Sequence, residues 1–351
     1  MNRIVPILLL AFLIGCTPVS TSSPTPPPPT VTPTVQPPAN IFALNQRIQR
    51  TVNLGNALEA PTEGDWGVVL QADYFQKIAA AGFTAVRIPI RFSAHAPDSA
   101  PYSLDPTFIA RVDWAVNNAI SNGLVAIVDM HHYLEMFSAP SENQARFLGL
   151  WQQIAEHYQD YPDDQLYFEL LNEPNGALTD AIWNDILAEA IPLIRKTNPT
   201  RPIIVGASGW NSFEDLANLR LPEDSNVIAT FHYYLPFQFT HQGAEWVDAS
   251  NAWMGTLWNG KPDELAAIAH DFDIAASWAA KHNRPLLLGE FGAYSKADQA
   301  SRVRWTAAVR QAAEERGFSW AYWEFCSGFG LYDRDASQWR QDLLGALIPT
   351  P

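Results

Sequence analysis

The chain has 351 residues, of which 47% are hydrophobic and 17% charged, and such a composition allows a globular protein with a sizeable core. The formal net charge of −15 argues against a nucleic-acid partner, because binding to phosphates requires clustered Lys and Arg. Cys16 and Cys326 are the only cysteines, so we expect no disulfide within the folded domain.

The first 16 residues are typical of an export signal. A basic start that includes Arg3 precedes an apolar run over residues 4–14, which is too short to span a bilayer but suits a signal peptide. The run ends in Leu13-Ile14-Gly15-Cys16, which is similar to a bacterial lipobox. We therefore predict an exported lipoprotein that meets the membrane only through a lipid anchor at Cys16. The alternative is a plain secretory signal with a chance cysteine.

Residues 17–40 contain nine prolines and no charged residue, and the rest are mainly Thr, Ser and Val. Such a tract cannot bury a core, so we predict an extended spacer. No second linker and no internal repeat follow. Residues 41–351 are therefore predicted to form one catalytic domain, which we expect to be a monomer.

Short β-rich runs alternate with helical segments along this domain, as in a parallel α/β fold. The predicted strands are residues 51–55, 85–90, 125–130, 166–171, 202–206, 227–232, 286–290 and 320–323. The predicted helices are residues 68–81, 106–122, 142–160, 181–196, 263–282 and 297–316. Eight strands over about 300 residues favour a (β/α)8 TIM barrel. An open sheet that binds a dinucleotide would require a Gly-rich turn after its first strand, and Gly55-Asn56-Ala57 is not one.

Polar side chains gather at the ends of the predicted strands. They are Arg87, His131, His132, Asn172, Glu173, His232, Tyr234, Glu290, Trp323 and Glu324. The carboxyl ends of the strands converge on one face of a barrel, so these side chains predict a site there.

Two glutamates follow strands that lie on opposite sides of such a barrel. Asn172-Glu173-Pro174 follows the fourth predicted strand, and Glu290 ends the seventh, before Phe291-Gly292. Hydrolysis of a glycosidic bond uses two carboxyl groups, one protonated and one ionised. A separation of about 5–5.5 Å indicates retention of configuration and about 6.5–9.5 Å indicates inversion. The alternative is that both are ordinary surface or salt-bridged carboxylates.

These motifs resemble the family 5 glycoside hydrolases, the main cellulase family of clan A. The general resemblance lies in Asn172-Glu173-Pro174, Glu290-Phe291-Gly292, Arg87, the His131-His132 pair and His232-x-Tyr234. The runs at residues 53–59, 239–246 and 322–330 are similar to a branch of bacterial endoglucanases that act on both glucan and mannan.

The resemblance implies that Glu173 is the acid/base and Glu290 the nucleophile. Burial near the Glu290 charge should raise the pKa of Glu173 and keep it protonated until it delivers its proton. Arg87 can orient Glu290, and Asn172 matches the family residue that binds the substrate 2-hydroxyl. Tyr234 can donate to the nucleophile.

The remaining substrate contacts are predicted with alternatives. His232 can position the acid/base, and one or both of His131 and His132 should face the reacting sugar. Trp323 resembles the platform under that sugar. We expect His241 and Trp246 to contact substrate, and Glu59 to bind a hydroxyl at an outer subsite unless it is a buried structural carboxylate.

We expect no cofactor and no metal. Zinc would require three or four ligands, and His131 and His132, adjacent on a strand, should point to opposite faces. The predicted function is endo-acting cleavage of β-1,4-glucan with retention. A β-mannanase or dual enzyme is the alternative within the class, and a non-catalytic carbohydrate-binding lipoprotein is the alternative outside it.

Overall fold

The computed structural model describes residues 40–349. The predicted signal peptide, Cys16 and residues 17–39 of the predicted linker lie outside the described residues, as do residues 350–351. The described residues group as one compact unit. Within residues 40–349, no helix combines the length and the apolar character needed to cross a membrane.

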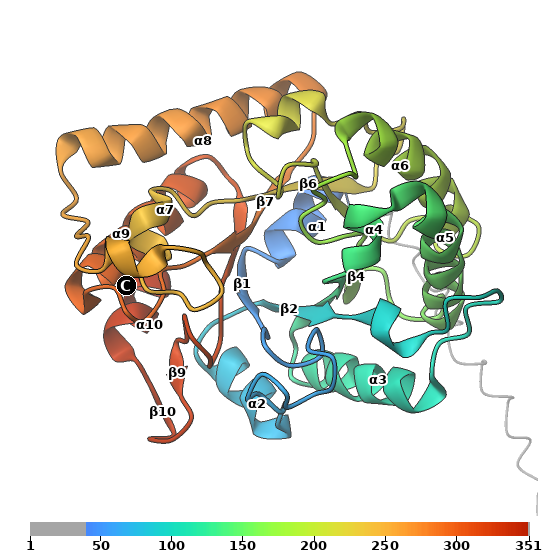
Figure 1. Cartoon of the computed structure of the whole chain (residues 1–351), viewed down its shortest axis with the longest axis horizontal. Coiled ribbons are helices and arrows are strands. Elements are labelled where there is room, and N and C mark those ends of the chain that lie inside the picture. Colours follow the sequence, from blue (N-terminus) through green and yellow to red (C-terminus); the bar gives the residue numbers. More distant parts are fainter. Residues whose placement is uncertain (1–39, 350–351) are drawn as a thin grey trace, which may run out of the picture. The chain divides into compact units, whose positions relative to one another are not determined.

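Eight parallel strands form a closed barrel in the order β1 to β8, so the predicted (β/α)8 fold is confirmed (Figure 1). The strands are β1 (Arg50–Asn53), β2 (Ala85–Ile90), β3 (Val125–Met130), β4 (Leu166–Glu169), β5 (Ile203–Gly206), β6 (Val227–His232), β7 (Leu286–Phe291) and β8 (Ser319–Tyr322). Each lies within two residues of its predicted bounds. The strands are buried throughout nearly their whole length, as expected where helices cover a parallel sheet.

Ten α-helices accompany the barrel in the described part of the chain. They are α1 (Ile41–Arg47), α2 (Ala72–Ala80), α3 (Pro106–Ser121), α4 (Leu134–Ser138), α5 (Pro140–His157), α6 (Asp180–Arg195), α7 (Phe237–Thr240), α8 (Pro262–His282), α9 (Gln299–Glu315) and α10 (Gln341–Leu347). Short 3-10 turns occupy Phe92–His95, Asp215–Asn218 and Ser250–Trp253, and a small hairpin joins β9 (Tyr332–Asp333) to β10 (Gln338–Trp339).

The helix predicted over residues 68–81 is too long at its start. Val68 and Leu70 are buried while Val69 between them is 45% exposed. This alternation is that of an extended segment, because side chains two residues apart share a face in extended chain. Helix α2 therefore begins at Ala72.

Helix α1 closes the amino-terminal end of the barrel. Asn40 caps it through a hydrogen bond from the Phe42 N–H to its side chain, at 3.0 Å. Ile41, Leu44 and Ile48 pack on an apolar layer of strand residues: Ala85, Val125, Ile127, Tyr167, Ile204, Ile228, Leu287 and Ala321. This end is thus sealed, and the carboxyl ends of the strands are left to carry a site.

Candidate active site

Glu290 points into the barrel because strand β7 is irregular at that point. Leu287 belongs to the interior layer, and a Cβ added at Gly289 would lie 2.6 Å from the Thr230 hydroxyl and 2.9 Å from the His232 ring. Strict alternation would then turn Glu290 outward. The register with β6 instead shifts between Phe231 and His232, so that His232 pairs with Glu290. This irregularity re-aims the carboxylate into the mouth of the barrel.

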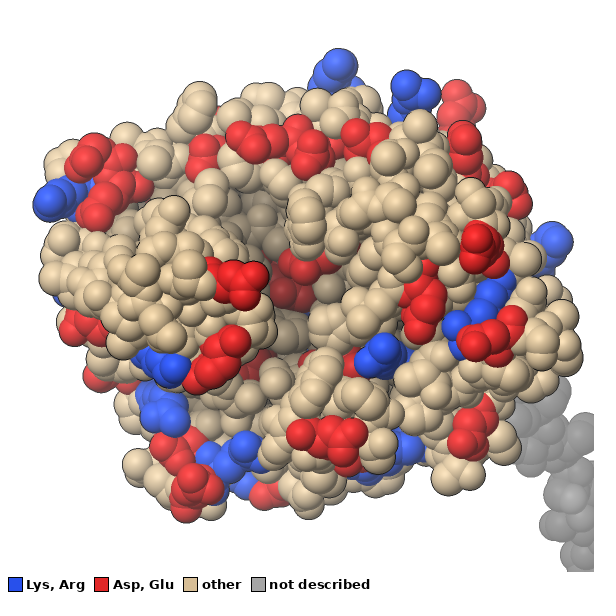
Figure 2. Space-filling view, in the orientation of Figure 1, with Lys and Arg blue, Asp and Glu red and all other residues tan. Residues whose placement is uncertain are grey.

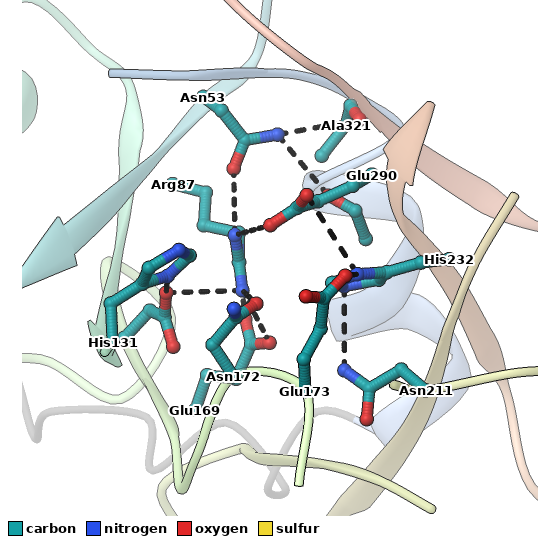
Figure 3. A network of polar contacts seen from close by, with 12 residues as sticks. Asn53, Arg87, His131, Glu169, Asn172, Glu173, Asn211, His232, Glu290 and Ala321 are labelled. Carbon is teal, nitrogen blue, oxygen red and sulfur yellow. Dashed lines mark hydrogen bonds and ion pairs between the residues drawn. The ribbon is translucent and has the colours of Figure 1, made fainter. Parts of the chain in front are cut away.

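Arg87 is buried beneath Glu290 and holds three carboxylates (Figure 3). Its Nη1 donates to Glu290 Oε1 at 2.8 Å, and its Nε and Nη2 donate to the two oxygens of Glu169 at 2.7 and 2.9 Å. Nη2 also lies 3.0 Å from Asp129 Oδ2 and donates to Asn172 Oδ1 at 2.8 Å. A fixed planar cation with five N–H donors suits such a cluster.

Asn53 ties this cluster to the barrel wall. Its Oδ1 accepts from Arg87 Nη1 at 3.0 Å, and its Nδ2 donates to the carbonyls of Gly289, Ala321 and Tyr322. The side chain therefore links β1 to β7 and β8 directly under Glu290.

Glu173 follows β4 in a left-handed backbone conformation, with φ of 46°. Asn211 Nδ2 donates to His232 Nε2 at 3.4 Å, which leaves the N–H of His232 on Nδ1, where it donates to Glu173 Oε1 at 2.8 Å (Figure 3). Burial lowers the pKa of His232 to about 4, so the ring is neutral near pH 7. A neutral ring with a fixed tautomer orients Glu173 without compensating its charge.

The two glutamates face one another at short range. One oxygen of Glu173, one of Glu290 and a ring nitrogen of His232 all lie within 4.8 Å of one another. Tyr234 donates its hydroxyl to Glu290 Oε2 at 2.9 Å. Two carboxylates this close leave no room for a water molecule between them and the sugar, so the spacing favours the retaining over the inverting arrangement.

Burial raises the pKa of Glu173 to about 7, and the nearby Glu169 carboxylate adds to the rise. Burial also raises the pKa of Glu290 to about 7, although His232 and the Arg87 cation act to lower it. The predicted repulsion between Glu173 and Glu290 also contributes, because the Glu173 charge helps to raise the pKa of Glu290. The contacts distinguish the two groups: Glu290 accepts hydrogen bonds from the Arg87 cation and from Tyr234, which favour its ionised form, whereas Glu173 accepts from the neutral His232 ring.

His131 and His132 do not point to opposite faces as the sequence suggested. Both lie past the end of β3, His132 has a φ of 50°, and their ring centroids are 4.5 Å apart. Strand alternation does not apply there, and both rings line one cavity. His131 stacks on Trp323 at 5.7 Å, and the ring of Trp323 fits because residue 55 is glycine: a Cβ there would lie 2.9 Å from the indole.

Two cavities adjoin at Glu173. The larger, of about 720 Å³, contains Glu290, Trp323, both histidines and Asn172. The smaller, of about 510 Å³, contains Trp210, Phe237 and His232. Glu173, Tyr234, His241 and Trp246 border both. Figure 2 shows the hollow on this face of the molecule, with acidic side chains at its floor.

The outer predicted contacts are also placed at these cavities. Trp246 is 60% exposed and packs edge-on against Tyr294, and His241 stacks on Phe237. Glu59 borders the larger cavity but is buried, and its carboxylate accepts from the N–H groups of Asn56 and Ala57. These contacts fit the structural alternative for Glu59, and its sugar-binding role stays a prediction.

Several residues of the site were not predicted from the sequence: Asn53, Trp66, Asp129, Glu169 and Asn211. Asp129 and Glu169 lie two to four residues before polar residues that were predicted, at inward positions of the same strands.

Glu173, His232 and Glu290 form a three-ligand group that the predicted histidine pair did not suggest. The group is a weak cation site, because Glu290 is already paired with the Arg87 cation and Glu173 with the His232 N–H. A bound cation would lie close to the Arg87 charge.

A closed barrel with two facing glutamates at its mouth is the architecture of a retaining glycoside hydrolase. Residues 48–328 match the family model described as cellulase (glycosyl hydrolase family 5). The chain belongs to this family.

The chain is 37% identical over 313 residues to Endoglucanase H of Acetivibrio thermocellus, covering 88% of this chain and 33% of that protein. The chain thus spans about a third of the length of that relative. Among solved structures, the endoglucanase Cel5A of the hyperthermophilic Thermotoga maritima is 48% identical, with a TM-score of 0.86 over 88% of this chain and 100% of that one. Structures of that protein with cellobiose and with mannotriose have been solved. Cellulose synthase subunit Z of Clostridioides difficile is 41% identical, with a TM-score of 0.84 over 86% of this chain and 99% of that one.

Proposed function

We propose that the protein is an endo-β-1,4-glucanase that cleaves its substrate with retention of configuration. The observation that carries the proposal is the short spacing of the Glu173 and Glu290 carboxylates, with oxygens within 4.8 Å, in the lining of the larger cavity. Relatives named endoglucanases over almost the whole described domain support the choice of glucan.

In the first step, Glu173 gives its proton to the glycosidic oxygen while a Glu290 oxygen attacks the anomeric carbon. The bond to the leaving chain breaks, and a glycosyl ester to Glu290 forms. The raised pKa of Glu173 supports its role as the proton donor. The hydrogen bonds from Arg87 and Tyr234 support Glu290 as the ionised nucleophile.

In the second step, the Glu173 carboxylate takes a proton from water, and the water oxygen attacks the anomeric carbon. The ester to Glu290 breaks, which returns both carboxyl groups to their starting states. Asn172 is fixed by Arg87, so its remaining amide donors can serve the sugar 2-hydroxyl. Two inversions at one carbon give net retention.

The two cavities supply room on both sides of the scissile bond. The sugar that reacts lies in the larger cavity with Glu290 and Trp323, and the leaving chain lies in the smaller cavity with Trp210 and Phe237. A cleft that continues past Glu173 in both directions accepts the interior of a chain, which is why we propose endo cleavage.

Replacing either glutamate tests the proposal. Glu290→Ala should leave a folded protein without polymer hydrolysis, and azide should restore turnover of an aryl cellobioside with an inverted glycosyl azide as product. Glu173→Ala should retain activity best on substrates with good leaving groups, because their departure in the first step needs no proton. The anomeric configuration of the products, read by NMR, checks both. Near-normal rates of reducing-sugar release by both variants would refute the assignment.

We propose mannan as a second substrate, because Thermotoga maritima Cel5A, at 48% identity, has been crystallised with mannotriose. Glucan and mannan differ in the orientation of one hydroxyl, at C2. Initial rates on carboxymethylcellulose, lichenan, glucomannan, galactomannan and xylan decide the question. Hydrolysis of glucans alone would exclude the dual activity.

We further propose that no metal takes part. Arg87 already supplies the positive charge beside Glu290, and a two-carboxylate mechanism needs no cation to activate water. Prolonged EDTA treatment should leave activity unchanged. A loss that added zinc reversed would contradict this proposal.

Export as a lipoprotein is also a proposal, and it rests on Leu13-Ile14-Gly15-Cys16. If Cys16 is acylated, the protein expressed with its own signal in a bacterium should partition into detergent, because several acyl chains anchor a protein stably. Cys16→Ser should abolish the partitioning without changing catalysis. A wholly soluble protein whose amino terminus is not Cys16 would refute the anchor and leave the hydrolase intact.

A further inference from the structure

Asn211 is a fully buried residue of the loop after β5, and it lines neither of the two cavities. Its Nδ2 donates to His232 Nε2, while its Oδ1 is buried with no hydrogen-bond partner among the described residues (Figure 3). A buried amide oxygen without a partner costs free energy. The side chain is therefore a poor stabiliser of the fold, and its one hydrogen bond points to a role at His232.

The backbone around Asn211 attaches its loop to both members of the acid/base pair. Trp210 and Asn211 are left-handed, with φ of 59° and 56°, a conformation that asparagine adopts more readily than most residues. The Asn211 carbonyl accepts from the His232 N–H at 2.8 Å. The Trp210 N–H donates to the carbonyl of Pro174, the residue after Glu173, at 3.1 Å. The loop is thus joined to the segments that carry His232 and Glu173.

The amide of Asn211 lies directly against Gly206, the last residue of β5. A Cβ added at Gly206 would lie 2.0 Å from Oδ1 and 2.9 Å from Nδ2 of Asn211. Residue 206 must therefore lack a side chain for the amide to reach His232. Two positions of the sequence are committed to this one contact.

The position of one imidazole proton decides which oxygen of Glu173 can carry a proton. The neutral ring of His232 has one proton for two nitrogens, and the hydrogen bond at one nitrogen fixes it on the other. Asn211 offers Nε2 a donor, so the proton lies on Nδ1 and points at Glu173 Oε1, 2.8 Å away. In the described part of the chain, Glu173 Oε2 has no hydrogen-bond donor, and the residue borders both cavities.

We propose that Asn211 is a positioning residue that keeps the acid proton of Glu173 on Oε2, the oxygen open to substrate. The inference rests on the proposed function, because only an acid/base needs its proton on a particular oxygen. If Nε2 carried the imidazole proton, the bare Nδ1 would accept the proton of Glu173 from Oε1, and that proton would point away from substrate. With the proton on Oε2, it passes to the leaving oxygen in the first step, and Oε2 takes a proton from water in the second.

Asn211→Asp tests the proposal with aryl β-cellobiosides whose leaving groups range from good to poor. The new carboxylate matches the amide in size, but it accepts from Nε2 and draws the imidazole proton there. A second proton on the ring would favour ionised Glu173 and weaken acid catalysis in the same way. We expect kcat/KM to fall on the order of a hundredfold for the poorest leaving group and less than about threefold for the best.

Asn211→Leu is the matched control, because leucine is similar in size and offers Nε2 neither a donor nor an acceptor. A proton on Nε2 would then be buried without an acceptor, so the proton should stay on Nδ1. The dependence of kcat/KM on the leaving group should therefore remain that of wild type. An equally steep dependence in both variants would show that packing alone matters, and it would overturn the proposal.

Nitrogen NMR of the full chain with isotopically labelled histidine reads the proton position directly, with His232→Gln to assign the signals. In wild type, Nε2 of His232 should give the signal of a bare nitrogen, and in Asn211→Asp that of a protonated one. A protonated Nε2 in wild type would overturn the inference, and this measurement does not depend on how well the variants fold.

The proposed function and this inference fail differently. If wild type hydrolyses none of the cellobiosides, the proposed function falls and the inference falls with it. If wild type hydrolyses them and Asn211→Asp lowers every rate by the same factor, or lowers none, the inference alone is overturned.

Discussion

The two ends of the barrel interior use the same strands for opposite purposes. On β2, Ala85 packs against helix α1, and two residues further Arg87 points into the mouth. On β3, Ile127 packs at the closed end and Asp129 follows at the open end. Residues two apart share a face of a strand, so each of these two strands contributes one apolar and one charged side chain to the interior.

The comparison teaches where the stability of the fold comes from. The closed end is an apolar layer, whose burial stabilises the folded state. The open end buries Arg87 with three carboxylates and places Glu173 nearby, so negative charge exceeds positive charge. Burying that excess costs free energy. We infer that the open end is kept for chemistry at the expense of stability.

Arg87→Met should have the largest effect. It leaves Asp129, Glu169 and Glu290 buried without their cation, so we expect a loss of about 3–5 kcal/mol in the free energy of unfolding and no measurable hydrolysis. Urea unfolding measures the loss of stability. Arg47→Met is the control, because its ion pair with Asp164 is half exposed and worth at most about 1 kcal/mol. Equal stability of the two variants would contradict the account.

At the closed end, Leu44→Ala should lower the free energy of unfolding by about 2–5 kcal/mol, because it leaves a cavity under the barrel. The kcat should stay that of wild type below the melting temperature, since Leu44 is far from the mouth along the strands. Phe42→Ala, on the exposed side of the same helix, should cost less than about 0.5 kcal/mol. A fall in kcat without a fall in stability would contradict the claim that the closed end serves stability and the open end serves catalysis.

The barrel could be predicted from the sequence because the patterns that indicate its strands and helices are local. A pattern recurs along the chain: a buried run rich in β-branched residues, such as β3, is followed by polar residues. Helix α1 was missed, since seven residues give too few turns for a periodic pattern. The start of α2 was misplaced because Val68 and Leu70 suit either an extended or a helical pattern.

The site was predicted less completely, for a physical reason. Glu173, Glu290 and Arg87 stand in recognisable motifs, and the structure brings them together. Glu169 and Asp129 sit inside apolar strands, and only the position of Arg87 across the barrel explains their burial. Such long-range pairing leaves no mark in the local sequence.

Glu169→Gln should destabilise the fold less than the variants above, and it tests how the buried charges at the open end act on one another. The Glu169 charge raises the pKa of Glu173, so its removal should lower that pKa. Because the acid/base must be protonated for the first step, the basic limb of the profile of kcat/KM against pH should move to lower pH. Gln can still accept from Arg87, which limits unfolding. A shift to higher pH would contradict the network described here.

The central claim is that burying ionised carboxyl groups at the open end lowers the stability of the fold. The most direct test is the free energy of unfolding of Glu173→Gln as a function of pH. Burial raises the pKa of Glu173 to about 7 from an unfolded value of about 4.5, so ionisation is harder in the folded state. The penalty is absent below the unfolded pKa, grows as the pH rises and is complete above the folded pKa. Because the side chain is 28% exposed, we expect a modest gain for the glutamine variant of about 1 kcal/mol at pH 8. That gain should vanish near pH 4, while hydrolysis of polymer is lost at every pH. A variant less stable than wild type at pH 8, or a difference that does not change with pH, would contradict the claim that this end is kept for chemistry.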